Sequence, residues 1–125
     1  MDPVPALVVL LDSVTQVAAE HAGFVVVSGS HGGASAARYA RAVAARLYVF
    51  NDAGVGKDEA GIAALALLDA QGLAAVTVSH VSARIGEARD TWECGVISHV
   101  NSCAARLGLR SGRALRTAVA TLPSD

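Results

Sequence analysis

Ionisable side chains that could transfer protons follow three apolar runs of the sequence, in the polar stretches 28–33, 51–58 and 79–89. Each stretch holds one group of a kind that enzymes use as a general acid, a general base or an orienting carboxylate. We predict three catalytic residues from them: His31, Asp52 and His80. Imidazole gains and loses its proton near neutral pH, so a histidine beside a carboxylate suits proton transfer on a bound substrate.

The first stretch also has the composition of an anion-binding turn. Gly29, Gly32 and Gly33 leave backbone N–H groups accessible just before a predicted helix, whose positive end attracts anions, and Ser30 adds a hydroxyl. Their spacing does not match the G-x-G-x-x-G pattern of dinucleotide-binding proteins. The same residues would also suit a tight turn between a strand and a helix, with the histidine pointing to solvent. We expect all four to contact the ligand.

Residues 51–61 combine three glycines with four charged side chains, an unusual composition for a simple connection. Gly56-Lys57 resembles the end of a phosphate-binding P-loop, but such a loop has glycine at the position of Asn51 and Ser or Thr at the position of Asp58. We therefore expect this stretch to form one wall of a pocket, with Asn51 and Lys57 as ligand contacts. The alternatives are a lysine paired with a neighbouring acid and an aspartate that only caps a turn.

The third stretch contributes Ser79, His80 and Arg84 as further ligand contacts, because the planar guanidinium of arginine suits a carboxylate or a phosphate. His31, Asp52 and His80 could together hold a metal ion, but the sequence lacks the H-x-H, H-E-x-x-H and C-x-x-C spacings, so we predict no metal site. The G-x-S-x-G motif of serine hydrolases is absent as well. The residues leave the cofactor unknown.

Four apolar runs predict the strands that position these stretches: 6–11, 24–28, 47–50 and 74–78. Apolar periodicity, capping residues and glycines predict helices at 14–21, 34–46, 58–71, 90–107 and 115–122. His99 then lies on the surface of the helix 90–107. The alternation indicates a single α/β domain over residues 1–125, with three α/β/α layers and a mainly parallel sheet of about four strands. Its strand order is open between a Rossmann-like and a flavodoxin-like arrangement.

The strand-to-helix loops of a parallel sheet all emerge at its carboxyl edge, where ligands bind. The three polar stretches follow three of the predicted strands, whereas the turns at the opposite edge, around Gly23, Arg46 and Gly72, are short. We therefore expect the three stretches to meet as the walls of one pocket.

The composition limits the class of protein. The 125 residues are 53% hydrophobic and 17% charged, which is more apolar than one small domain needs, so we expect a homo-oligomer formed through the apolar helix 58–71. The net charge is −1 and no cluster of Lys and Arg occurs, so no nucleic-acid partner is expected. No apolar run approaches the ~20 residues of a membrane span and the first residues are not basic, so we expect no membrane partner and a cytoplasmic location.

These observations predict a small-molecule-binding α/β protein. We expect an enzyme, or a subunit of one, that acts on a small polar, anionic metabolite through the loops at the carboxyl edge of the sheet. The alternative is a non-catalytic, oligomeric module for binding or assembly, because no complete catalytic motif is present and helix 58–71 is apolar nearly all round. The residue types leave the reaction and the cofactor unnamed.

Overall fold

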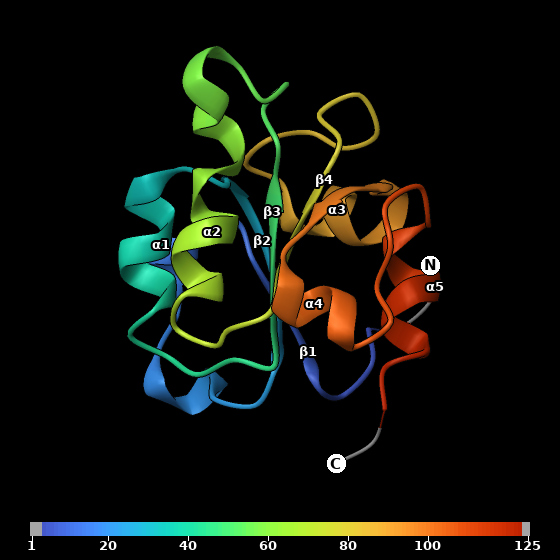
Figure 1. The fold of residues 1–125 in the computed structure, drawn as a ribbon. Helices are drawn as coiled ribbons and strands as arrows, with labels where there is room; N and C mark the ends of the chain where they lie inside the picture. Colours follow the sequence, from blue (N-terminus) through green and yellow to red (C-terminus); the bar gives the residue numbers. More distant parts are fainter. Residues whose placement is uncertain (1–3, 124–125) are drawn as a thin grey trace.

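Five strands form one sheet, in which each strand lies beside the next one along the chain (Figure 1). The computed structural model describes residues 4–123. Four strands are parallel and the fifth runs antiparallel to β4: β1 (Val8–Leu11), β2 (Val25–His31), β3 (Leu47–Asn51), β4 (Ala75–Val78) and β5 (Ile97–Val100). The predicted α/β class with a mainly parallel sheet is confirmed. The consecutive order differs from the Rossmann and flavodoxin orders, in which the first strand lies inside the sheet.

Side chains of the first three crossovers pack against one face of the sheet. The elements of these crossovers are the 3-10 turns η1 (Val14–Gln16) and η2 (Ala19–His21), helix α1 (Ala34–Ala40), and η3 (Lys57–Ile62) followed by α2 (Ala63–Asp69). Buried residues of η1, α1 and α2 contact Val26, Tyr48, Phe50 and Ala75 of the sheet. These strand residues alternate with residues that face the other side, so each strand is apolar on both faces.

After β4 the chain passes to the other face of the sheet. That face is covered by α3 (Ala88–Cys94), α4 (Ser102–Arg106) and α5 (Leu115–Ala120). Trp92, Ala104 and Leu115 from these helices join Val27 and Val76 of the sheet in a second buried apolar layer. Figure 1 shows the sheet between α1 and α2 on one side and α3 and α5 on the other. Within residues 4–123, none of the helices has the length and apolar character that crossing a bilayer requires.

Three predicted helices are interrupted in the structure. The segment 14–21 forms only the two 3-10 turns, and the segment 58–71 begins as η3 because Asp58 and Glu59 have left-handed backbone angles, with φ of 55° and 57°. The predicted helix 90–107 is wrong. It consists of α3, β5 and α4, so His99 lies on a strand and not on a helix surface. α3 ends at Gly95, which has an extended conformation, and the β-branched residues that follow favour a strand.

The chain between β4 and α3 crosses back over the carboxyl ends of the first strands. The Gly86 amide donates to the Gly29 carbonyl at 2.7 Å, and the Ala88 amide at the start of α3 donates to Asp12 Oδ1 at 2.9 Å. α3 consequently packs against β1 and β2. Gly29 permits this close approach, because a Cβ there would lie 2.6 Å from the Glu87 nitrogen and 2.7 Å from the Asp12 carbonyl oxygen.

We predict that Gly29→Ala destabilises the fold by about 3 kcal/mol, because the added methyl meets backbone atoms that cannot rotate away. Gly23→Ala is the matched control. Gly23 has open space around its missing Cβ and only a left-handed φ of 80°, so its loss should be about 1 kcal/mol. Urea denaturation of both variants measures the difference, and equal losses would show that the crossing does not depend on Gly29.

Candidate functional site

The loops that leave β3 and β4 diverge to opposite faces of the sheet. The β3 loop leads to η3 and α2 on one face, and the β4 loop leads to α3 on the other (Figure 1). In α/β proteins a ligand crevice forms where neighbouring parallel strands send their connections to opposite faces. Asp52 and His80 lie at the start of these two loops.

Asp52 is almost fully buried, with 4% of its surface exposed. Its Oδ1 accepts hydrogen bonds from the backbone amides of Gly54 at 2.8 Å and His80 at 3.1 Å, and its own amide donates to the Val78 carbonyl at 2.9 Å. The carboxylate is therefore fixed by both loops at once, as a buried charge requires.

The pKa of Asp52 lies below its ordinary value. Burial by itself raises the pKa, but the Gly54 amide, a hydrogen bond from the Ser98 side chain, the His80 amide and the nearby His80 ring together lower it. The folded site thus holds Asp52 as a carboxylate.

The His80 ring lies beside this carboxylate and is half exposed. Its Nδ1 is 3.4 Å from Asp52 Oδ1, and 52% of the side chain is accessible to solvent. The ring rests against Gly54, where a Cβ would come within 3.4 Å of it. A proton on Nδ1, facing the carboxylate, leaves Nε2 as a proton acceptor. The pair has the arrangement of a general base and its orienting acid.

A β-bulge in β5 adds two more polar side chains. His99 pairs with Thr77 and Ile97 pairs with Val78, so Ser98 is an extra residue in β5. The Ser98 hydroxyl lies 2.9 Å from the Thr77 hydroxyl and 3.2 Å from His99 Nδ1, and Thr77 Oγ1 is 3.3 Å from the same nitrogen. Bulges often direct side chains into functional sites. The sequence pattern predicts a helix for Ser98 and His99, so this cluster was not expected. The β-branched composition of 96–100 after Gly95 is the signal that indicates a strand.

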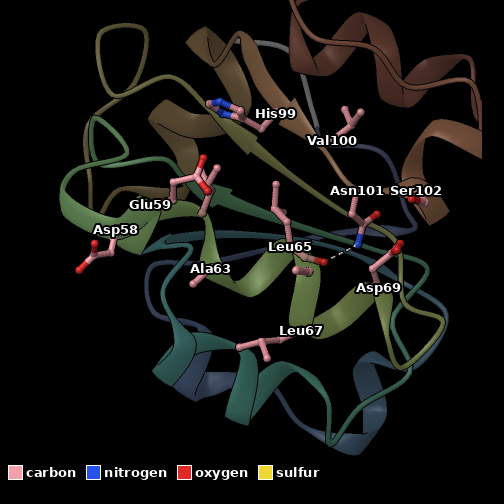
Figure 2. A pocket seen from close by; sticks show the side chains of 12 residues that line it. Asp58, Glu59, Ala63, Leu65, Leu67, Asp69, His99, Val100, Asn101 and Ser102 are labelled. Carbon is pink, nitrogen blue, oxygen red and sulfur yellow. Dashed lines mark hydrogen bonds between the residues drawn. The ribbon is translucent and has the colours of Figure 1, made fainter.

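A hollow of about 620 Å³ runs between α2 and β5 (Figure 2). Its lining is aliphatic along α2 and polar at both ends, where it includes Asp58, Glu59 and His99 at one end and Asp69 and Ser102 at the other. No Lys or Arg occurs among the described residues that line it. The groove therefore favours an uncharged or cationic ligand over an anion.

His31 lies apart from the Asp52–His80 pair. It pairs with Asn51 in the sheet, but it lines a separate hollow of about 300 Å³ together with Asp12, Ser35 and Tyr39, and neither Asp52 nor His80 lines that hollow. The His31 ring covers Gly33, where a Cβ would lie 2.8 Å from Nε2. The structure thus brings together two of the three predicted catalytic residues.

The remaining residues predicted from the first stretch make internal contacts. Gly29 packs against the backbone of the segment that crosses back toward α3. Gly32 packs against the Gly61 carbonyl, and a Cβ on Gly32 would lie 2.8 Å from that oxygen. Ser30 Oγ accepts a hydrogen bond from the Val14 amide at 2.9 Å, and Gly33 precedes the first turn of α1. These contacts give each residue a role in folding that is independent of a ligand.

Two of the ligand contacts predicted in the other two stretches form hydrogen bonds within the protein, and two others are exposed to solvent. Asn51 is buried and donates to the Ala83 carbonyl at 2.9 Å, and Ser79 Oγ accepts from the Ser82 amide at 3.1 Å. Lys57 is exposed on η3. The Arg84 side chain is 79% exposed, 3.9 Å from the Glu87 carboxylate. The stretch 79–89, which we expected to form the third wall of the pocket, therefore carries Arg84 on an exposed loop.

The loop after Asp52 has a strained backbone. Ala53, Val55, Asp58 and Glu59 all have positive φ, between 51° and 68°. Such angles are uncommon outside glycine and are costly for a β-branched residue such as Val55. Backbone strain of this kind concentrates at functional sites. Here it directs the Gly54 amide to the Asp52 carboxylate.

Within residues 4–123, no three His, Cys, Asp or Glu side chains gather in a way that could hold a metal ion. Comparison with known proteins gave no match to a family model, a curated protein or a solved structure. We therefore infer the function from the geometry of the site.

We predict that Asp52 makes stability depend on acid pH. Since its pKa is lowered in the folded state, its contribution is complete above the unfolded carboxyl pKa and is lost as the pH falls through the folded one. Asp52→Asn should cost about 1–3 kcal/mol at pH 7, by weakening hydrogen bonds to a charged group. The difference from the wild type should shrink toward pH 3, as measured by urea denaturation across the pH range. A difference that stays constant with pH would contradict the assignment.

Proposed function

We propose that the protein is an enzyme acting on a small polar molecule, with His80 as the proton-transfer residue and Asp52 as the residue that orients it. One observation carries the proposal: a buried carboxylate, held by two backbone amides, lies 3.4 Å from a half-exposed imidazole at the point where two loops diverge. Perturbed carboxylates next to histidines are frequent in active sites.

In this proposal His80 Nε2 removes a proton from the substrate. The imidazolium that forms is stabilised by the Asp52 carboxylate beside Nδ1, and the proton returns to the product or to solvent. Asp52 remains ionised throughout, because its hydrogen bonds favour the charged form. The separation of 3.4 Å would shorten as the ring becomes charged, since catalytic hydrogen bonds tighten when substrate binds.

The charge of the proposed substrate follows from the surroundings. The sequence favoured an anion, on the basis of Arg84 and Lys57, but both side chains are exposed. The groove along α2 begins at Asp58 and Glu59, which follow Asp52 along the chain, and it has carboxylates at both ends. We therefore propose an uncharged or cationic metabolite, with an anion as the alternative that a ligand screen would detect.

The test is a thermal-shift and NMR screen of amines, polyols, carboxylates and phosphates, followed by NMR detection of turnover for each compound that binds. We expect His80→Gln and Asp52→Asn to lower kcat by roughly 10²–10⁴-fold, the usual contribution of general base catalysis. His31→Gln is the matched control and should leave kcat unchanged. Full turnover by His80→Gln, or loss of turnover only in His31→Gln, would overturn the assignment.

The exposed apolar surface of α2 supports a second proposal, a non-catalytic module that assembles through this helix. The helix is exposed along Ala66 and Leu67, and Leu67 has 49% of its surface accessible. Residues 63–68 carry no charged side chain, and we propose that another chain covers the apolar surface that Ala66 and Leu67 expose. A second copy of the chain would be the partner.

We predict that the wild-type protein is a dimer at micromolar concentration and that Leu67→Glu is a monomer, because the new charge would have to be buried in the interface. Val81→Glu is the control, since Val81 is 83% exposed on a different surface, and this variant should stay dimeric. Light scattering after gel filtration measures the mass. A wild-type monomer would exclude the assembly module and leave the enzyme proposal intact.

A further inference from the structure

Leu67 lies on a ridge between two hollows of opposite charge. One is the groove between α2 and β5, which contains Asp58 and Glu59. The other, of about 350 Å³, lies between α1 and α2 and contains Arg38 and Arg41. Leu67 lines both hollows. Figure 1 shows α1 and α2 side by side on one face of the sheet, so an acidic and a basic surface lie on either side of α2 on that face.

The hollow between α1 and α2 is positively charged. Arg38 and Arg41 are three positions apart on α1 and its C-terminal end, a spacing that places both on the same side of a helix, and both are exposed. No Asp or Glu occurs among the described residues that line this hollow. Within residues 4–123, neither guanidinium forms an ion pair with a carboxylate. Both are therefore available to carboxylates of another molecule.

The groove on the other side of α2 offers carboxylates. Asp58 and Glu59 are exposed on η3, and the neighbouring Lys57 is not among the residues that line the groove. Asp69, at the far end, already has a partner within the chain, because its Oδ1 accepts a hydrogen bond from the Cys103 amide at 2.9 Å. The acids of the groove that a partner would meet are thus Asp58 and Glu59.

Small and apolar side chains separate the two charged groups. Leu67 has 49% of its surface exposed. The alanines beside it in the two hollows are Ala34 and Ala37 on α1, and Ala63 and Ala66 on α2. Helices of two molecules pack by placing the ridge of one into a groove of the other, and small side chains at the contact allow a short distance between them. This face therefore has the shape of a helix-packing surface.

We propose that two copies of the chain associate about a two-fold axis, with Arg38 and Arg41 of each copy paired with Asp58 and Glu59 of the other. A two-fold axis forms every contact twice, so a surface that carries both charges is complementary to itself. Electrostatic complementarity of this kind selects the partner and the register. The burial of Leu67 adds apolar contact area, which contributes to affinity.

This inference rests on the proposed assembly through α2 and deepens it, because it names the groups that meet. It assigns the acids of the groove to the arginines of a second copy, whereas the enzyme proposal assigns them to a substrate. Neither Asp52 nor His80 is among the residues that line the two hollows, so that pair is not part of the proposed interface.

Two charge-reversed variants test the pairing: Arg38→Glu/Arg41→Glu and Asp58→Lys/Glu59→Lys. Each variant alone brings like charges together in both contacts, so we expect its dimerisation to weaken by roughly 100-fold or more. An equal mixture of the two restores opposite charges in both contacts and should form a hetero-dimer. The chain with all four substitutions should form a homodimer again. Light scattering after gel filtration gives the mass, and native mass spectrometry identifies the hetero-dimer.

Arg110→Glu/Arg113→Glu is the matched control and should stay dimeric. These exposed arginines lie between α4 and α5, which cover the opposite face of the sheet. Association on mixing also shows that the reversed variants are folded, because misfolded chains would not recover a specific dimer.

The outcomes separate the pairing from the assembly proposal. If Leu67→Glu is a monomer while both reversed variants stay dimeric, the pairing is overturned and assembly through α2 stands. Reversed variants that remain monomeric after mixing overturn the pairing as well. A wild-type monomer overturns both, and amide signals of Leu67 that then shift with an amine or a carboxylate would assign the two hollows to small ligands.

Discussion

A carboxylate that is withdrawn from water must be hydrogen-bonded, and Asp52 meets this requirement with backbone amides from two separate segments. The Gly54 amide belongs to the loop after β3, and the His80 amide follows β4. The loops that contain these amides lead to opposite faces of the sheet. The same carboxylate therefore fixes both the strained loop after β3 and the backbone that carries the imidazole.

The elements that could be predicted are those whose apolar pattern is continuous. The four parallel strands are confirmed, because runs such as Val25–Val27 and Tyr48–Phe50 have no polar residue that could face solvent. Helix lengths were overestimated. The left-handed backbone angles at Asp58 and Glu59 do not change the apolar pattern of the sequence, which is otherwise that of a helix. The apolar residues of the strand Ile97–Val100 have helical spacing relative to apolar residues on both sides of it.

The site could be located in part from position alone. Asp52 and His80 directly follow strand ends, so the rule for parallel sheets places them at one edge, and the structure brings them into contact. His31 follows the same rule but lines another hollow, because side-chain direction depends on the register shift between Val27 and His31. The cluster of Thr77, Ser98 and His99 was missed. The β-branched residues at 96–100 indicate a strand, but the proximity of the three side chains arises from a bulge that the sequence pattern does not show.

The bulge makes the length of one short segment matter. Side chains of a strand alternate between the faces of a sheet, and the extra residue Ser98 lets Ile97 and His99, which are two positions apart, pair with adjacent residues of β4 and face opposite sides. Ile97 is almost fully buried in the layer beneath α3 and α5, and Asn101 is tied to Leu65 and Leu73 by hydrogen bonds. Both ends of the segment are anchored. Insertions and deletions between Gly95 and Asn101 should consequently be tolerated far less than in the exposed loop around Val81, even where every remaining residue is unchanged.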